Sequence, residues 1–146
     1  MYVEMDRKPD NGCEIHLACC GESGIMIHLK IRKTARANQR DKVSEEDKLL
    51  NEGTRVLKDL VIPWTKTDHL VVADLHIASV MTAEACHKIG LRFIGVVKTA
   101  TKRFPYKCLQ SCELEDHGSF KALHHHKVNE SDPDVLAFIW MDCGRR

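Results

Sequence analysis

A strand that ends in an acid, followed by a helix, a glycine and a second strand, is the feature that most constrains this chain. Leu70–Ala73 is a short valine-rich run typical of a buried strand, and Asp74 ends it. A helix is predicted over Thr82–Ile89, with its first residue as the cap and Gly90 just beyond its end. Phe93–Val97 is the next apolar run. An acid at the carboxyl end of a buried strand faces the crevice where α/β proteins bind ligands, so Asp74 is a candidate site residue.

The rest of the chain supplies further strands and helices. Residues 13–20 and Ile25–Ile31 are apolar enough for two strands, and the glycine-containing turn between them predicts a β-hairpin. Asn51 is a predicted N-cap for a helix whose apolar residues recur every three or four positions until Pro63 ends it. The remaining predicted elements are a helical turn at Tyr106–Leu109 and a pair of strands at 119–128 and 135–142.

Composition indicates one globular domain over residues 1–146, with a charged loop or insertion at about 32–50. Hydrophobic residues make up 43% of the chain and charged residues 29%, which is ordinary for a soluble domain. The formal net charge of +1 does not mark a strongly basic nucleic-acid binder, so any such function must rest on local charge. The apolar runs are far too short to span a bilayer, so no membrane partner is expected.

The N-terminus and the cysteines together indicate a reducing intracellular compartment. Acids occur among the first six residues and no apolar stretch of a signal peptide follows them. The 7 cysteines are an odd number without a secretory signal, which argues against a disulfide framework. We expect most of them to be buried thiols that act as small hydrophobic residues, and we expect Trp64 and Trp140 to anchor the core.

A zinc site is an alternative use of the C-terminal third. Alternate residues of a strand share a face, so His124 and His126 could act together with Cys108 and Cys112 in a tetrahedral site. The wide gap between the cysteines and the close pair of histidines argue against zinc, and a polar strand face is the simpler interpretation. A small zinc-binding or protein-interaction module therefore stands as the alternative function.

The order of these elements resembles the piggyBac-type transposase domain over most of the chain. The most specific stretch runs from Val71 to Pro105, and the first strand with its turn and the strand near Asp142 also fit. The resemblance implies an α/β, RNase H-like fold with a mixed sheet flanked by helices. We expect that sheet to be incomplete, because its third strand would fall in the charged segment. The resemblance also implies DNA as a partner and a nuclear location. The motifs that carry it are Val71–Asp74, Ala78–Glu84, Gly90–Thr99 and Lys102–Pro105.

The resemblance further implies DNA transposition by three carboxylates that hold two Mg²⁺ ions. Asp74 matches the second of these acids, although without the resemblance the residue pattern favours a turn or cap aspartate over a metal ligand. The first acid would fall at or near Cys20, whose thiol is a poor Mg²⁺ ligand, and Glu22 is displaced along the turn. The third would lie beyond Asp142, where this sequence stops. We therefore expect a vestigial metal position at Asp74, no resident cofactor and no strand-cleaving enzyme.

Three basic residues downstream of the second strand are the candidate DNA contacts. Lys98, Lys102 and Arg103 follow that strand closely and would lie near the crevice at Asp74. Lysine and arginine side chains supply most of the sequence-independent affinity for the phosphate backbone. The alternative is an ordinary solvated surface. The sequence thus predicts a transposase-derived domain with residual DNA binding.

Overall fold

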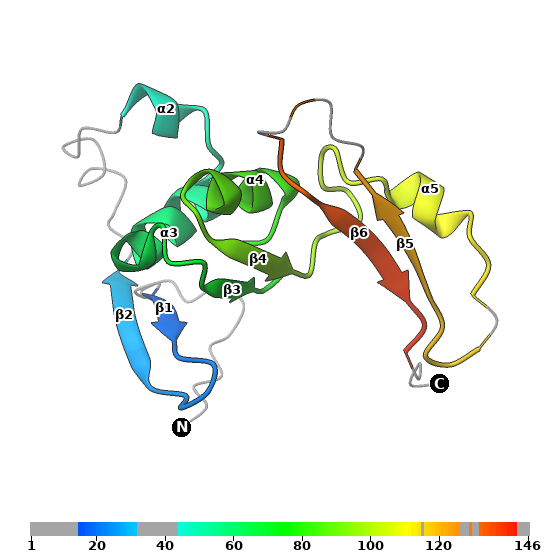
Figure 1. Cartoon of the computed structure of the whole chain (residues 1–146), viewed down its shortest axis with the longest axis horizontal. Coiled ribbons are helices and arrows are strands. Elements are labelled where there is room, and N and C mark those ends of the chain that lie inside the picture. The colour runs from blue at the N-terminus through cyan, green and yellow to red at the C-terminus, as the bar shows by residue number, and fades with distance from the viewer. Residues whose placement is uncertain (1–14, 32–43, 115, 126–128, 130–131, 143–146) are drawn as a thin grey trace, which may run out of the picture.

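The computed structural model describes residues 15–31, 44–114, 116–125, 129 and 132–142, and these form an α/β arrangement of paired strands and short helices (Figure 1). No helix in these ranges is both long enough and apolar enough to cross a membrane. The elements in chain order are β1 (Ile15–Cys19), β2 (Met26–Ile31), α2 (Glu45–Lys48), α3 (Glu52–Val61), η1 (Ile62–Trp64), β3 (Leu70–Ala73), α4 (Val80–Lys88), β4 (Arg92–Gly95), α5 (Tyr106–Gln110), β5 (Phe120–His124) and β6 (Leu136–Trp140).

The predicted N-terminal hairpin is confirmed. β1 and β2 pair antiparallel, with Leu17 opposite Leu29. The turn between them is closed by two backbone hydrogen bonds, from Gly24 N to Cys20 O at 2.8 Å and from Cys20 N to Ile25 O at 2.9 Å. Residues 13 and 14, where the first strand was predicted to begin, lie outside the described residues.

The helix predicted after Asn51 is also confirmed. The Asn51 side chain accepts a hydrogen bond from Thr54 N at 2.8 Å, which satisfies one of the free amides of the first turn of α3. The α-helix ends at Val61, and Pro63 lies in the 3₁₀ turn η1, because proline has no amide hydrogen to continue the α-helical pattern.

The charged stretch before α3 is partly helical. Residues 32–43 lie outside the described residues, but 45–48 form α2, which Ser44 caps. Lys58 of α3 donates a hydrogen bond to Asp47 at 2.6 Å and ties the two helices together. That bond and a second from the Ser44 hydroxyl lower the pKa of Asp47 below its usual value.

β3, α4 and β4 form a parallel strand–helix–strand unit, in which Leu70 lies opposite Arg92 and Ala73 opposite Gly95. β4 ends at Gly95, two residues earlier than predicted, because β3 ends at Ala73 and offers no further partner. Gly90 takes the predicted position after α4, with φ of +74°. A Cβ atom there would approach the Lys66 Cα to 2.9 Å, so only glycine fits without movement.

The predicted start of α4 is wrong. The helix begins at Val80 with Ser79 as its cap, and the Ser79 hydroxyl accepts from Thr82 N at 3.1 Å. Ser79 and Thr82 are both capping residue types, but the Thr82 side chain is fully buried and serves another role, described below.

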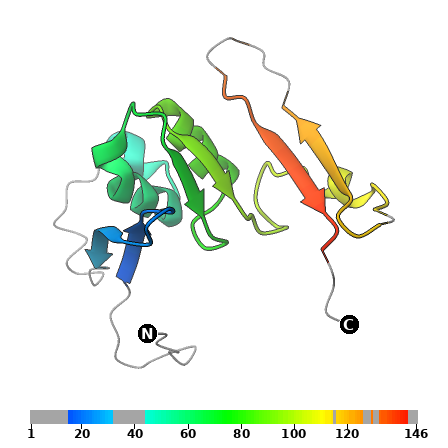
Figure 2. The same ribbon diagram turned by 60° about the horizontal axis from the view of Figure 1, so that its bottom comes forward.

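The hydrophobic core lies between α3, α4 and the inner faces of β1, β3 and β4. Figure 2 shows the helices beside these strands. The buried members of the core are Leu57, Leu60, Val61, Cys86 and Leu91. Trp64 packs against this cluster, as predicted for a core anchor. The same prediction for Trp140 is wrong, since that side chain is 52% exposed on β6.

The C-terminal strands pair as predicted but are shorter. β5 and β6 run antiparallel, with Phe120 opposite Trp140 and His124 opposite Leu136. Across the described residues, the strands form three separate two-stranded sheets, β1–β2, β3–β4 and β5–β6, where one mixed sheet was expected.

Candidate functional site

Asp74 ends β3 and is exposed, as predicted. Its Oδ1 atom accepts hydrogen bonds from two backbone amides of the following loop, His76 N at 3.1 Å and Ile77 N at 3.3 Å. This is the geometry of a turn aspartate, in which a side-chain oxygen replaces a backbone acceptor. The carboxylate of Asp74 therefore already organises its own loop.

A chain of hydroxyl groups, which we call the hydroxyl seam, fixes that loop against both helices. Thr54 Oγ1 of α3 lies 2.9 Å from Thr82 Oγ1 of α4, and Thr82 Oγ1 lies 2.8 Å from Ser79 Oγ. Thr82 also donates to the carbonyl oxygen of Ile77 at 2.8 Å. Thr54 and Thr82 are both 0% exposed. The seam was not predicted from the sequence. The pattern that could have indicated it is a pair of capping residue types three positions apart at the start of α3 and again at the start of α4.

The position matched to the first acid is a thiol. Cys20 lies at the start of the hairpin turn, and the Ser23 hydroxyl, followed by the backbone of the turn, lowers the pKa of its thiol by hydrogen bonding. Cys86 is the opposite case, because burial in the core raises its pKa to about 11. A thiolate is a soft ligand and does not suit Mg²⁺.

The residues around Asp74 do not fit a two-metal centre. Two Mg²⁺ ions need several carboxylate oxygens on converging elements. Within the part of the chain that the structure describes, no group of three or more His, Cys, Asp or Glu side chains is placed to hold a metal ion. Among those described residues, Asp74 therefore has no set of companion ligands of the kind that this chemistry needs.

The structure does not bring the described members of the alternative zinc set together. Cys108 is exposed on α5, and the Cys112 thiol donates to the Cys108 carbonyl oxygen at 3.5 Å. His124 Nε2 is bonded to Asp134 across the C-terminal hairpin. His126, the fourth predicted ligand, lies outside the described residues.

The basic segment after β4 divides into two kinds of residue. Arg103, with φ of +66°, makes two parallel hydrogen bonds to Glu84 of α4, at 2.7 and 2.8 Å. This paired geometry is the strong form of an Arg–carboxylate contact. Lys98 and Lys102 are exposed and form no ion pair with another described residue. Their charges remain available to an anion.

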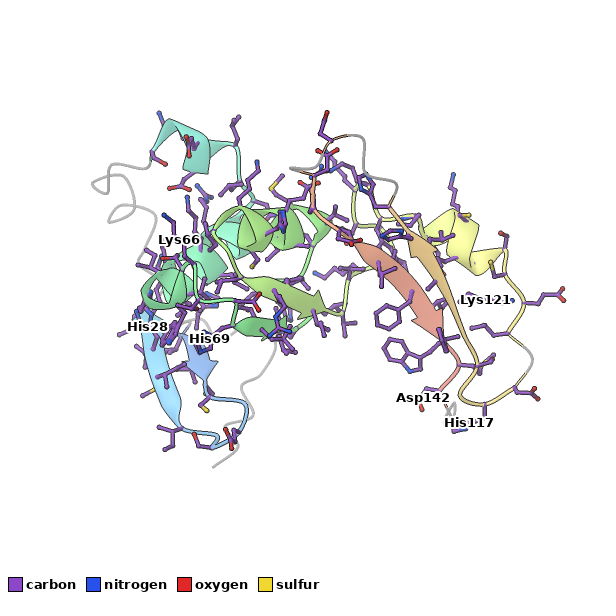
Figure 3. All side chains as sticks on the ribbon, in the orientation of Figure 1. His28, Lys66, His69, His117, Lys121 and Asp142 are labelled. Atoms are coloured by element: carbon purple, nitrogen blue, oxygen red, sulfur yellow. The ribbon has the colours of Figure 1, made fainter. Side chains whose placement is uncertain are left out.

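A second group of basic side chains lies at the opposite end of β3 from Asp74. Lys66 and His69, both labelled in Figure 3, precede β3, and their segment pairs with the chain around Gly90 through Lys66 N to Ile89 O at 2.8 Å. Arg92 lies beside them and contacts Asp68 at 3.3 Å. Sequence analysis missed this grouping, because the loops that form it are more than twenty residues apart.

The comparisons with known proteins agree with this fold. Residues 1–143 match the family described as Transposase IS4. The chain therefore belongs to this IS4/piggyBac-type family of DDE transposases, and the resemblance to piggyBac is confirmed. No curated protein matches the chain.

A solved structure gives the same result for the fold. The cryo-EM structure of a piggyBac transposase synaptic complex with hairpin DNA matches 93% of this chain, with a TM-score of 0.61 and 16% sequence identity. The chain spans 28% of the length of that transposase chain. At this identity the similarity shows a shared fold, and the activity of the larger protein does not follow from it.

Proposed function

We propose that this chain is a piggyBac-transposase-derived domain of RNase H-like type that binds DNA without cutting it. The family match and the order of elements support the ancestry. An antiparallel hairpin followed by a parallel strand–helix–strand unit over one core supports an RNase H-like arrangement of these elements. We place its action in the nucleus, where the DNA is.

The proposed loss of DNA cleavage rests on the surroundings of Asp74, where the described residues provide no set of metal ligands. Hydrolysis of a phosphodiester by two metals requires carboxylates that bridge and orient both ions. Here Asp74 is engaged with its own loop amides, and the first-strand position holds the thiol of Cys20. The hard ligands that would complete the site are not grouped around Asp74 among the described residues.

A nuclease assay tests this half of the proposal. The chain is expected to leave a DNA duplex uncut in Mg²⁺ and in Mn²⁺, and the Asp74→Ala variant is expected to behave like the unmodified chain. The measurement is product formation on a denaturing gel. Cleavage by the unmodified chain that disappears in Asp74→Ala would show a working metal site and end this part of the proposal.

The DNA-binding half rests on Lys98 and Lys102. Each exposed ammonium group can neutralise one phosphate and release a condensed counterion. Arg103 can contact a DNA phosphate only if its hydrogen bonds to Glu84 break. While those bonds are intact, Arg103 holds the loop that carries the two lysines against α4. The loop that carries the lysines follows the carboxyl end of β4. Because β4 runs parallel to β3, this loop lies at the same end of the strand pair as the carboxyl end of β3.

Replacing Lys98 and Lys102 together by alanine is expected to weaken binding to a DNA duplex about tenfold at low salt and to reduce the slope of log K against log salt by about 2. The measurement is a fluorescence anisotropy titration at several salt concentrations. The matched control is Lys66→Ala with Lys121→Ala, which removes two exposed lysines elsewhere in the chain. An equal loss in both double variants would show that total charge, rather than this loop, sets the affinity.

A further inference from the structure

The loop between β4 and α5 carries Arg103 in the second of two consecutive turns. Thr101 N donates to the Lys98 carbonyl oxygen at 2.9 Å, and Phe104 N donates to the Thr101 carbonyl oxygen at 3.2 Å. Arg103 is the third residue of the second turn and has φ of +66°, a backbone conformation that favours glycine and that a side chain makes less favourable. The contact that Arg103 makes from this position offsets part of that cost.

That contact is with Glu84, which holds the guanidinium group from α4. Arg103 Nη1 donates to Glu84 Oε1 at 2.7 Å, and Arg103 Nη2 donates to Glu84 Oε2 at 2.8 Å. Arginine uses the same pair of parallel hydrogen bonds to bind a phosphate group. The Arg103 side chain is 55% exposed, so an anion from solution can reach it. The Glu84 carboxylate therefore occupies donors that a DNA phosphate would otherwise use.

The three basic residues of this loop differ in what a phosphate has to displace. Lys98 and Lys102 form no ion pair with another described residue, so a phosphate that binds there replaces water and counterions. A phosphate that binds Arg103 has to displace the carboxylate of Glu84 and then lies close to that unpaired negative charge. Because one anion only replaces another, the exchange at Arg103 adds little to the affinity for DNA.

We propose that Arg103 is a third phosphate-binding residue of this loop and that Glu84 suppresses it by acting as an internal substitute for the phosphate. This inference rests on the proposed function, because it concerns the regulation of the same DNA-binding loop. In the unmodified chain, DNA binds through Lys98 and Lys102. Removing the negative charge at position 84 releases the guanidinium group of Arg103, while the backbone hydrogen bonds keep both turns closed.

The variant Glu84→Gln tests this inference in a fluorescence anisotropy titration of the full chain with a DNA duplex at several salt concentrations. It is expected to bind about fivefold more tightly than the unmodified chain at low salt. The slope of log K against log salt is expected to steepen by about 1, because the protein then contacts one more phosphate. Far-ultraviolet circular dichroism checks that the variant keeps its fold.

Two further variants control for net charge. Glu113→Gln removes the same charge at an exposed residue outside this loop, and it is expected to change the affinity by less than about twofold, because salt screens exposed charges that make no contact. Glu84→Gln combined with Arg103→Ala has the net charge of the unmodified chain. It is expected to bind DNA as the unmodified chain does, since the released guanidinium group is no longer present.

Three results would overturn the inference. Equal gains in Glu84→Gln and Glu113→Gln would show that only net charge matters. A gain that persists in the double variant would mean that Arg103 is not the added contact. No gain in Glu84→Gln would mean that the ion pair does not restrain binding. If that last result occurs while replacement of Lys98 and Lys102 still weakens binding, the proposed function stands and only its regulation by Glu84 fails.

Discussion

Replacing Leu57 by alanine is expected to lower the free energy of unfolding by about 3 kcal/mol. Leu57 is 4% exposed and lies in the core cluster with Leu60 and Cys86, between α3 and α4. The change removes apolar atoms from the one place where both helices and the inner strand faces meet. The cavity left there cannot close fully, because neighbouring elements are held by the hydroxyl seam.

The measurement is urea denaturation followed by circular dichroism at a fixed protein concentration, so that any self-association affects all variants equally. Leu49→Ala makes the same chemical change at a side chain that is 82% exposed, and it is expected to cost less than about 0.5 kcal/mol. Similar losses in the two variants would mean that the cluster around Leu57 is not the centre of stability.

Replacing Thr82 by valine is expected to cost about 2 kcal/mol, although the two side chains have nearly the same shape. Thr82 is fully buried and its hydroxyl bonds to Thr54, Ser79 and the Ile77 carbonyl oxygen. Valine removes the hydrogen-bond partner of the fully buried Thr54 hydroxyl and the donor to the Ile77 carbonyl oxygen, whereas Ser79 keeps its bond from the Thr82 amide. The loss is therefore the cost of unsatisfied polar atoms rather than of lost packing.

Two further variants separate these causes, again by urea denaturation. Thr82→Ser keeps the hydroxyl and is expected to retain most of the hydrogen-bond contribution. The double variant Thr54→Val with Thr82→Val is expected to cost less than the sum of the two single changes, because each removes a partner that the other leaves unsatisfied. Strict additivity would mean that the two hydroxyls do not depend on each other.

Local patterns predicted the elements well. The valine run gave β3 with its observed bounds of Leu70–Ala73, and Asn51 caps α3 as expected, because both signals lie within a few adjacent residues. The position of Asp74 at the end of β3 followed for the same reason. The role of Asp74 depends on two backbone amides of its own loop, whose positions the sequence does not show. Its role as a turn residue was therefore predicted only as an alternative.

Features that depend on contacts between distant segments could not be predicted. Ser79 and Thr82 are both capping residue types, with serine preferred, and the burial of Thr82 against Thr54, 28 positions away, gives Thr82 a different role. The hydrogen bond between Arg103 and Glu84 likewise joins two separate segments. The periodicity of the sequence does not predict that these segments lie close together. The alternation along β1 and β2 shows that one face is apolar, but which face meets α3 depends on His28 and Lys30 finding partners there.

Among the described residues, the C-terminal hairpin has its main contacts with α5. β5 and β6 pack against α5, and the cluster around Leu57 draws on no residue from these three elements. A segment that shares no buried residues with the main core opens at a free energy set by its own contacts. Leu109 is 1% exposed on α5, so we expect its burial to hold this segment together and the segment to open while the strand–helix–strand unit remains native.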